Sequence, residues 1–405
     1  MPFGSEGLQA GTGIALSGGG FRATLFHLGA LWRLRELGVL QRVDRISSVS
    51  GGSLTAGKLA LEWPALAKAA WSAEAFLARV VEPLRKFCTR DVDVPSVIKG
   101  ALVPGKSIAD FVADQYDEGL YGKATLQDLP DTPRFVFNST NLATGVDFRF
   151  SKPYAGDYRI GLIAQPRLGL ATAVAASSAF PPFLSPVELH LDPDSFEKVR
   201  GADLYDDVSF RRTVKLTDGG VYDNLGLETI AKRYKTLLVS DAGAPFGYGG
   251  VQGSDWPRQA LRIIDVLRHQ AWSLRVRQLI REFREGHDGA YWGISTPLSR
   301  FGTPGALTVP EEATRKLASI RTRLDRFSDP EQCSLINWGY AVCDAAVRKT
   351  LAAAPPPAWP YPQYALDGGV PRDVTVEPHV EPPSQPDAIW VEEHGPDEGA
   401  AAGGG

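Results

Sequence analysis

The sequence predicts an α/β fold with a mainly parallel central sheet flanked by helices, and three stretches support this prediction. Residues 14–16 form a short apolar run that stops at three glycines, after which apolar residues recur at helical spacing. Residues 43–49 form a second strand-like run before another helical pattern, and residues 236–241 form the clearest buried strand in the chain. Strands that alternate with helices indicate parallel strands covered on both faces.

The first predicted strand ends at a glycine loop, Gly18 to Gly20, which opens a predicted helix. Consecutive glycines allow a tight turn and leave backbone N–H groups uncovered by side chains. These groups would lie at the positive end of the helix dipole, so the loop could hold an anion or an oxyanion. A nucleotide phosphate is disfavoured, because neither Gly-x-Gly-x-x-Gly nor Gly-Lys-Ser/Thr is present.

Ser50 follows the second predicted strand and precedes a predicted helix. A nucleophile elbow needs small residues two positions before and two positions after the serine, because its turn is strained. Ser48 and Gly52 meet this requirement, and Gly51 stands beside the serine. The pattern alone is weak, and its value comes from its position between a strand and a helix, shortly after the glycine loop.

Asp218 ends a short predicted strand, residues 214–217, and two glycines follow it. A carboxylate presented in this way could take a proton from a serine hydroxyl as a general base. An ordinary Asp-Gly turn is the alternative, and Asp223 is a weaker candidate for the base. His27 falls inside the first predicted helix, where we expect it to face the core or a neighbouring helix.

Together these motifs resemble those of the patatin-like phospholipases, which carry a Gly-Gly-Gly-x-Arg-Gly loop, a Gly-x-Ser-x-Gly elbow and an Asp-Gly-Gly motif. The resemblance extends over residues 12–245 and includes two further stretches, residues 137–145 and 175–182. Two positions differ from the family pattern: Ala23 stands where the loop motif ends in glycine, and Ser48 stands where the elbow begins with glycine.

The resemblance implies a patatin-like three-layer fold and a lipid acyl hydrolase of the phospholipase A or lysophospholipase type. It implies Ser50 as nucleophile and Asp218 as its base, with an acyl-enzyme intermediate and no histidine, cofactor or metal. The oxyanion would be bound by backbone N–H groups of Gly18, Gly19, Gly20 and Gly51, and Arg22 would support the loop. The substrates would be glycerophospholipids, lysophospholipids or acylglycerols.

Two other classes of function stay open. The chain could be a membrane-degrading effector that a partner or a small signalling ligand switches on. It could also be a non-catalytic lipid-binding scaffold, which the presence of the glycine loop and of both dyad residues disfavours. The oligomeric state does not follow from the sequence.

Composition limits the remaining possibilities. A formal net charge of −4 excludes a protein that binds nucleic acid through an overall basic character. The three cysteines, Cys88, Cys333 and Cys343, lack metal-ligand spacing and fit a reducing, cytoplasmic compartment. Residues 1–11 show no secretory signal, and no apolar run approaches 18 residues, so we expect membrane contact to be peripheral.

We expect one hydrolase domain over residues 1–351, with core motifs in residues 12–245 and a helical C-terminal part in residues 256–351. Residues 352–405 are rich in Pro, Gly and acidic residues, which is typical of an extended or disordered tail. Aromatic residues that could pin parts of this tail to the domain are Trp359, Tyr361 and Trp390.

Two helical stretches have more than one reading. Residues 63–129 resemble an ordinary helical cap more than a lid, broken into short pieces at Pro64, Pro83, Pro95 and Pro104. Residues 256–285 carry a basic face, which is more often solvated than bound to lipid head groups. Its arginines are Arg258, Arg262, Arg268, Arg275, Arg277, Arg281 and Arg284.

Overall fold

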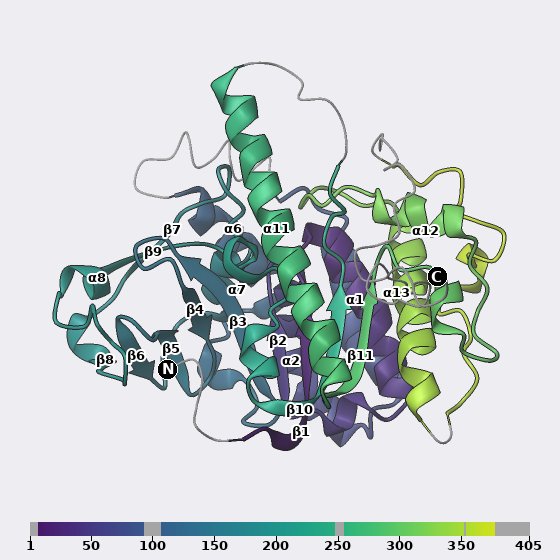
Figure 1. Cartoon of the computed structure of the whole chain (residues 1–405), viewed down its shortest axis with the longest axis horizontal. Helices are drawn as coiled ribbons and strands as arrows, with labels where there is room; N and C mark the ends of the chain where they lie inside the picture. The colour runs from purple at the N-terminus through teal and green to yellow at the C-terminus, as the bar shows by residue number, and fades with distance from the viewer. Residues whose placement is uncertain (1–6, 93–106, 248–254, 352–353, 377–405) are drawn as a thin grey trace, which may run out of the picture. The chain divides into compact units, whose positions relative to one another are not determined.

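The computed structural model describes residues 7–92, 107–247, 255–351 and 354–376 (Figure 1). Three residues named above, Pro95, Pro104 and Trp390, lie outside the described residues. The described residues divide into two compact units: those within 7–245 and 288–376, and those within 246–287.

Five parallel strands form the centre of the sheet in the first unit. Their order is β11 (Asp288–Gly293), β10 (Tyr234–Asp241), β1 (Gln9–Leu16), β2 (Arg45–Ser48) and β3 (Arg134–Asn141). Figure 1 shows β10, β1 and β2 side by side, so the three strands predicted from the sequence are neighbours. Their carboxyl ends share one edge of the sheet, which is where open α/β sheets hold their ligands. The predicted mainly parallel centre is confirmed.

Beyond β3 the sheet becomes antiparallel. The strands that continue it are β4 (Asp147–Phe150), β5 (Tyr154–Asp157), β6 (Gly161–Ala164) and β8 (Phe196–Glu197). A second branch leaves the other side of β3, where β9 (Thr213–Asp218) pairs antiparallel with the last residues of β3 and with β7 (Val187–His190). The strand that carries Asp218 therefore runs against β3, a direction that the sequence analysis did not specify.

Helices flank the sheet and give the chain a three-layer α/β arrangement. Helix α1 (Gly20–Glu36) packs against α2 (Gly51–Lys68) and α13 (Asp329–Val347). Helix α7 (Leu170–Ser177) packs against α2, β3 and β9, and α10 (Glu228–Ala231) packs on β1, β2 and β10.

The remaining elements of the first unit are short. The α- and π-helices are α3 (Ala73–Phe76), η2 (Leu77–Val81), α4 (Glu82–Phe87), α6 (Ile108–Tyr116), η3 (Asp117–Tyr121), α8 (Ser209–Arg212), α9 (Gly220–Asp223) and α12 (Glu311–Ala318). The 3-10 turns are η1 (Leu40–Arg42), η4 (Leu126–Asp128), η5 (Pro193–Ser195), η6 (Leu298–Phe301), η7 (Arg348–Thr350) and η8 (Pro362–Tyr364).

Pro64 does not break the chain into separate helices as the sequence suggested, because it lies inside α2. A proline in a helix interior removes one backbone hydrogen bond and costs about 3 kcal/mol. Helix α2 tolerates this loss because it buries an apolar face on both sides of the proline, with Leu59, Trp63 and Leu66 all buried. Pro83, in contrast, stands at the start of α4, where a proline is well accommodated.

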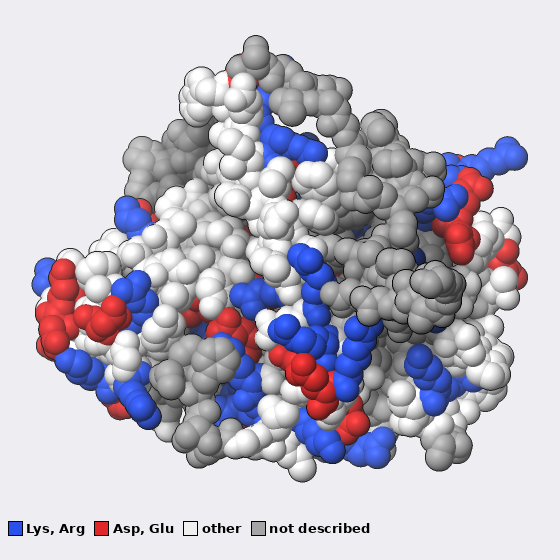
Figure 2. All heavy atoms as spheres, in the orientation of Figure 1, with Lys and Arg blue, Asp and Glu red and all other residues white. Residues whose placement is uncertain are grey.

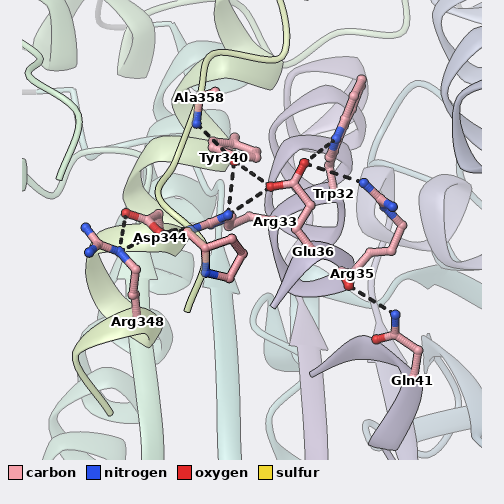
Figure 3. Close-up of polar contacts among 10 residues, drawn as sticks. Trp32, Arg33, Arg35, Glu36, Gln41, Tyr340, Asp344, Arg348 and Ala358 are labelled. Carbon is pink, nitrogen blue, oxygen red and sulfur yellow. Dashed lines mark hydrogen bonds and ion pairs between the residues drawn. The ribbon is translucent and has the colours of Figure 1, made fainter. Parts of the chain in front are cut away.

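A buried polar cluster joins α1 to α13 (Figure 3). The guanidinium of Arg33 lies 2.7 Å from the carboxylate of Asp344, and both side chains are fully buried. Arg33 also lies 2.9 Å from the carboxylate of Glu36, to which the hydroxyl of Tyr340 donates a hydrogen bond. Burial and the neighbouring Glu36 raise the pKa of Tyr340, so this hydroxyl keeps its proton. The cluster fixes the C-terminal helix to the helix that follows the glycine loop.

The first part of the segment expected to be extended packs on the first unit. The backbone N–H of Tyr361 donates to the side-chain oxygen of Asn337 in α13, and the amide group of Asn337 donates to the carbonyl of Tyr361. Leu366 is completely buried, and Trp359 packs against the core. Two of the aromatic residues suggested as anchors, Trp359 and Tyr361, thus lie on the domain.

The second unit contains α11 (Trp256–Arg284), whose first turn is capped by the side chain of Asp255. His269 of this helix stacks between Phe246 and Trp272, with ring centroids 4.7 and 5.5 Å away. Neither α11 nor any other helix in the described ranges combines the length and apolar character needed to span a bilayer.

Candidate active site

The glycine loop joins β1 to α1 and adopts conformations that only glycine accepts readily. Gly19 has φ 143° and Gly20 has φ 58°, and a Cβ on Gly20 would lie 1.7 Å from the carbonyl oxygen of Thr322. The N–H of Gly18 donates to the carbonyl of Asn224 at 3.0 Å. The loop is thus held from one side by the segment after Asp218 and from the other by the segment around Thr322.

Three backbone N–H donors belong to the glycine loop and to the residue that follows Ser50. Within the described ranges, the N–H groups of Gly19, Gly20 and Gly51 have no hydrogen-bond acceptor in the protein. Gly20 and Gly51 are the first residues of α1 and α2, where N–H groups have no partner inside the helix. Two helix N-termini therefore meet here, and both favour negative charge.

Ser50 stands in the sharp turn between β2 and α2. Its φ of 50° and ψ of −121° are strained for a residue with a side chain, as a nucleophile elbow requires. A Cβ on the next residue, Gly51, would lie 2.0 Å from the carbonyl oxygen of Gly20, so the elbow and the glycine loop touch directly. A Cβ on Gly18 would lie 3.1 Å from the Cβ of Ser50. The predicted nucleophile and the predicted oxyanion loop are adjacent.

Ser177 and Asn138 hold the elbow in place. The backbone N–H of Ser50 donates to the hydroxyl of Ser177 at 3.0 Å, and that hydroxyl donates to the carbonyl of Asn138 at 2.7 Å. The side-chain amide of Asn138 donates to the carbonyl of Ser48 at 2.9 Å. These contacts fix the backbone of Ser48 and of the strained residue, Ser50.

Ser48, which replaces the usual glycine at the start of the elbow, finds hydrogen-bond partners for its hydroxyl within the core. Ser48 donates to the carbonyl of Val136 at 3.3 Å and accepts a hydrogen bond from Ser53 at 3.0 Å. Ser48 is fully buried, so a hydroxyl without these partners would be destabilising. The departure from the family pattern is therefore accommodated by polar neighbours.

The register of the sheet brings the end of β9 to the elbow. On one side of β3, Ser48 of β2 is paired with Phe137, and Asp218 of β9 is paired with Ser139. Residues two apart along a strand are about 7 Å apart. Strands β2 and β9 run in opposite directions and thus meet end to end beside Asn138. A Cβ on Gly219 would lie 3.2 Å from Val49, which confirms how closely the two turns pack.

The backbone and the carboxylate of Asp218 are both held by hydrogen bonds. Its N–H donates to the carbonyl of Ala179 at 2.9 Å, and its carbonyl accepts from the hydroxyl of Thr140 at 2.9 Å. Its Oδ1 accepts from the N–H of Gly220 at 2.7 Å. Asp218 is 4% exposed and Ser50 is 8% exposed, so both residues are almost completely buried.

Arg22 binds the protein's own backbone. Its side chain is buried and donates to the carbonyls of Ala318 and Ile320, each at 2.8 Å, and of Ala242 at 2.7 Å. These carbonyls lie beyond β10 and before α13. Arg22 therefore ties the start of α1 to two distant segments of the chain.

His27 is a buried, neutral residue that contacts Ser17, the residue before the glycine loop. Its Nδ1 lies 2.8 Å from the hydroxyl of Ser240, and its Nε2 lies 2.9 Å from the carbonyl of Ser17. Since a carbonyl can only accept, Nε2 carries the proton and Nδ1 accepts from Ser240. Burial lowers the pKa of His27 to about 4, and the hydrogen bond to Ser17 opposes this shift only partly. His27 supports the residue before the loop, in keeping with its expected place in the core.

Asp223, the weaker candidate for the base, caps the turn that follows. Its two carboxylate oxygens accept from the N–H groups of Leu225 at 3.2 Å and Glu228 at 2.9 Å. Its neighbour Asn224 lies closer to the glycine loop, because a Cβ on Gly18 would be 2.5 Å from the Asn224 Oδ1.

Sequence reasoning missed three residues of this site: Asn138, Ser177 and Asn224. Asn138 and Ser177 belong to the two further stretches that resemble the family, and Asn224 follows Asp223. The resemblance of those two stretches was the available signal for Asn138 and Ser177. The partners of these residues could not be deduced, because each contact joins segments far apart in the sequence.

Metal-ligand types do not cluster in the part of the chain that the structure covers. Over residues 7–92, 107–247, 255–351 and 354–376, no group of three or more His, Cys, Asp or Glu side chains is arranged to hold a metal ion. Cys88, Cys333 and Cys343 are buried and form no disulfide with one another. Burial raises the pKa of Cys333 to about 12, so its thiol stays protonated.

Comparison with known proteins agrees with the motifs. The family model of the patatin-like phospholipases matches residues 14–230, more than half of the chain. Among curated proteins none matches the sequence.

Human GIVD cytosolic phospholipase A2 is similar in structure, with a TM-score of 0.46 and 13% identity over 84% of this chain and 62% of that one. VipD from Legionella pneumophila has a TM-score of 0.33 and 13% identity over 83% and 66%. The chain thus spans less than two thirds of the length of either protein. With the family match over the glycine loop, the elbow and Asp218, the chain belongs to the patatin-like phospholipases, a family of lipid acyl hydrolases.

Proposed function

We propose that this protein hydrolyses carboxylic esters of lipids, as a phospholipase A or lysophospholipase, with Ser50 as nucleophile and Asp218 as general base. One observation carries the proposal: the register of β2 and β9 along β3 brings the strained Ser50 turn and the Asp218 turn together. Each turn has its own set of hydrogen bonds, so the two groups are held before any substrate arrives. Such preorganisation is what nucleophilic catalysis needs.

The reaction would proceed in two steps. The carboxylate of Asp218 accepts the proton of the Ser50 hydroxyl while Oγ attacks the ester carbonyl, and the alcohol or lysolipid leaves with that proton. Water then attacks the acyl-enzyme, with Asp218 again taking a proton, and the fatty acid is released as Ser50 is restored. The hydrogen bond from the Gly220 N–H to Asp218 Oδ1 leaves the carboxylate in a fixed orientation for both transfers.

The oxyanion of each tetrahedral intermediate would be stabilised by backbone N–H groups. We assign this role to Gly19, Gly20 and Gly51, whose N–H groups have no acceptor in the described ranges. Gly18 has a different role, since its N–H is bound to the carbonyl of Asn224 and holds the loop in shape. Losing one oxyanion donor in comparable sites lowers the rate by about 10²–10³-fold.

The proposal is tested by covalent labelling and by product release. The wild-type protein, Ser50→Ala and Asp218→Asn are incubated with a fluorophosphonate probe, and intact mass is measured. Ser195→Ala serves as control, because Ser195 is an exposed serine in the 3-10 turn η5, just before β8, the last strand in the order of the sheet. We expect one adduct on the wild type and on the control, none on Ser50→Ala, and slow labelling of Asp218→Asn.

Fatty-acid release from phosphatidylcholine, lysophosphatidylcholine and diacylglycerol then identifies the substrate class. Release by the wild type and not by Ser50→Ala supports the proposal. An adduct on Ser50→Ala, or equal lipid hydrolysis by that variant, would refute it. Lipid binding without turnover in either protein would favour the scaffold reading instead.

A further inference from the structure

We propose that α11 (Trp256–Arg284) is an interfacial helix that docks the protein on an anionic lipid surface. The inference rests on the proposed function only in that the substrate is a lipid aggregate, and it concerns a part of the chain outside the candidate active site. It is carried by an exposed apolar stripe and by an excess of arginine on one helix.

The apolar stripe occupies the first two thirds of α11. Trp256, Ile263, Leu267 and Leu274 follow one another at i, i+7, i+11 and i+18, which places them on one face of a helix. Their exposed fractions are 80%, 57%, 62% and 58%. A helix of a globular domain normally turns such a row toward the core. Here the side chains of the row are exposed, and Figure 2 shows uncharged side chains over much of the upper half of this helix.

Positive charge is concentrated on the same helix. Residues 256–284 contain seven arginines and two acidic residues, Asp265 and Glu282, although the whole chain has a formal net charge of −4. Three of the arginines continue the outward face after the apolar stripe ends, at Arg277, Arg281 and Arg284. The long side chains of arginine can place their charge among lipid head groups while the apolar row enters the acyl boundary.

Ion pairs within α11 cannot cancel this charge, because the helix holds seven arginines and only two acidic residues. The arginines at 258, 268 and 281 lie 3.5, 3.8 and 4.0 Å from acidic groups on the same helix or at its ends. Pairs at such distances on an exposed surface are weak and are easily exchanged for other anions. Anionic phospholipid head groups provide such anions at high local density. The combination of Trp and Leu on one face with arginines beside it is typical of helices that lie in the membrane interface.

A second copy of the chain fits this face less well than a membrane does. A coiled-coil seam requires an apolar repeat sustained over three or four heptads. In α11 the row changes after Leu274 to Gln278, Arg281 and Glu285, so the apolar repeat ends at residue 274. Two copies in parallel would also bring their arginine-rich ends together, which is unfavourable without counter-ions.

The test uses the full chain with Ser50→Ala, so that vesicles stay intact. Sedimentation measures its partition onto vesicles of phosphatidylcholine alone or with 30% phosphatidylserine. We expect binding to the anionic vesicles, at least tenfold weaker binding without phosphatidylserine, and weakening as salt is raised. Ile263→Ser combined with Leu267→Ser should lower the affinity on the order of 100-fold, and Arg277→Gln with Arg281→Gln about 10-fold.

A matched control variant and a second, fluorescence readout accompany the binding assay. Leu142→Ser removes a leucine of similar exposure, 53%, from a turn in the first unit, and should bind vesicles as the parent does. A fluorophore on Leu267→Cys should show a blue-shifted emission on anionic vesicles, since the three native cysteines are buried. On a soluble short-chain ester, the α11 variants with Ser50 intact should retain the activity of the wild type.

Three results would overturn the inference. The first is equal vesicle binding by the Ile263→Ser/Leu267→Ser protein, and the second is a label at 267 that stays in water. The third is a lipid-free dimer that these substitutions dissociate, which would make the face a contact between copies. Because the readouts are binding and not turnover, a protein that docks through α11 but hydrolyses no ester would refute only the proposed function.

Discussion

The backbone N–H of Ser50 donates a hydrogen bond to the hydroxyl of Ser177, which lies 127 residues further along the chain, at a distance of 3.0 Å. The same hydroxyl donates to the carbonyl of Asn138. One buried side chain therefore supports a strained residue from β2 and a residue of β3 at the same time. The elbow depends on α7 as well as on its own sequence.

Ser177→Ala should weaken the elbow without removing Ser50, the proposed nucleophile. The N–H of Ser50 and the carbonyl of Asn138 would both lose a partner, and leaving buried groups unsatisfied costs about 1–3 kcal/mol. If about 1–2 kcal/mol of this is lost from the transition state, fluorophosphonate labelling slows about 5- to 30-fold. Stopped-flow or timed mass measurements check the rate. Ser178→Ala is the control, because the hydroxyl of Ser178 bonds back to Val174 in its own helix. Equal labelling rates for wild type and Ser177→Ala would contradict this role.

Gly51→Ala should abolish labelling at Ser50. The new methyl group would lie 2.0 Å from the carbonyl oxygen of Gly20, so the glycine loop and the elbow could not keep their present approach. Overpacking of this kind costs about 1–3 kcal/mol and displaces backbone. Gly368→Ala is the matched control, since a Cβ there would meet no atom within 4 Å. Circular dichroism confirms that the variant folds, and normal labelling of folded Gly51→Ala would refute the proposed contact.

Asp344→Ala should destabilise the protein more than any exposed ion pair does. Arg33 would lose its fully buried carboxylate partner and keep only the partly exposed Glu36, and breaking a buried pair from one side costs about 3–5 kcal/mol. Urea unfolding measures the change, with Asp206→Ala as a comparison at an exposed pair with Lys198. The double variant Arg33→Met/Asp344→Leu should recover much of the loss, because it removes both fully buried charges together. A stability of Asp344→Ala equal to that of Asp206→Ala would contradict this assignment.

His27 should make the protein less stable in mild acid. In the unfolded chain its pKa is near 6.5, and in the folded protein burial lowers it to about 4. Between these values the unfolded chain binds a proton that the folded protein does not, so stability falls as the pH drops from about 6.5 toward 4. The loss from pH 7 to pH 5 should be about 2 kcal/mol for this group alone.

His27→Gln isolates this contribution, because glutamine can donate to the Ser17 carbonyl but does not titrate. Unfolding free energies of wild type and variant are measured from pH 4.5 to 8. We expect the difference between the two proteins to shrink or change sign as the pH falls. Parallel curves would show that His27 is not responsible.

Much of the candidate site could be predicted because its parts are local. The glycines at 18–20, the small residues around Ser50 and the Asp-Gly-Gly turn each express a backbone requirement within a few residues. The contacts between these parts are not local. Nothing near Asp218 specifies that β9 runs antiparallel to β3, and periodicity of apolar residues gives no strand direction.

The roles of single side chains were harder to predict for the same reason. Arg22 is bound by carbonyls at 242, 318 and 320, more than 200 residues away. The N–H of Gly18 donates to the carbonyl of Asn224, and this hydrogen bond distinguishes Gly18 from Gly19 and Gly20. Pro64 suggested a break, but burial of the apolar face of α2 outweighs one lost hydrogen bond.

The second unit lies in the chain between β10 and β11, which are hydrogen-bonded neighbours in the sheet. It is therefore an insertion in the connection between two parallel strands. The entropy of closing such a connection rises slowly, by about 0.6 kcal/mol for each doubling of its length. The insertion can thus be lengthened, shortened or replaced at little cost to the sheet. Evolution could retune where the protein docks while the residues around Ser50 stay unchanged, and a chimera that exchanges residues 246–287 would be the natural way to engineer a new target surface.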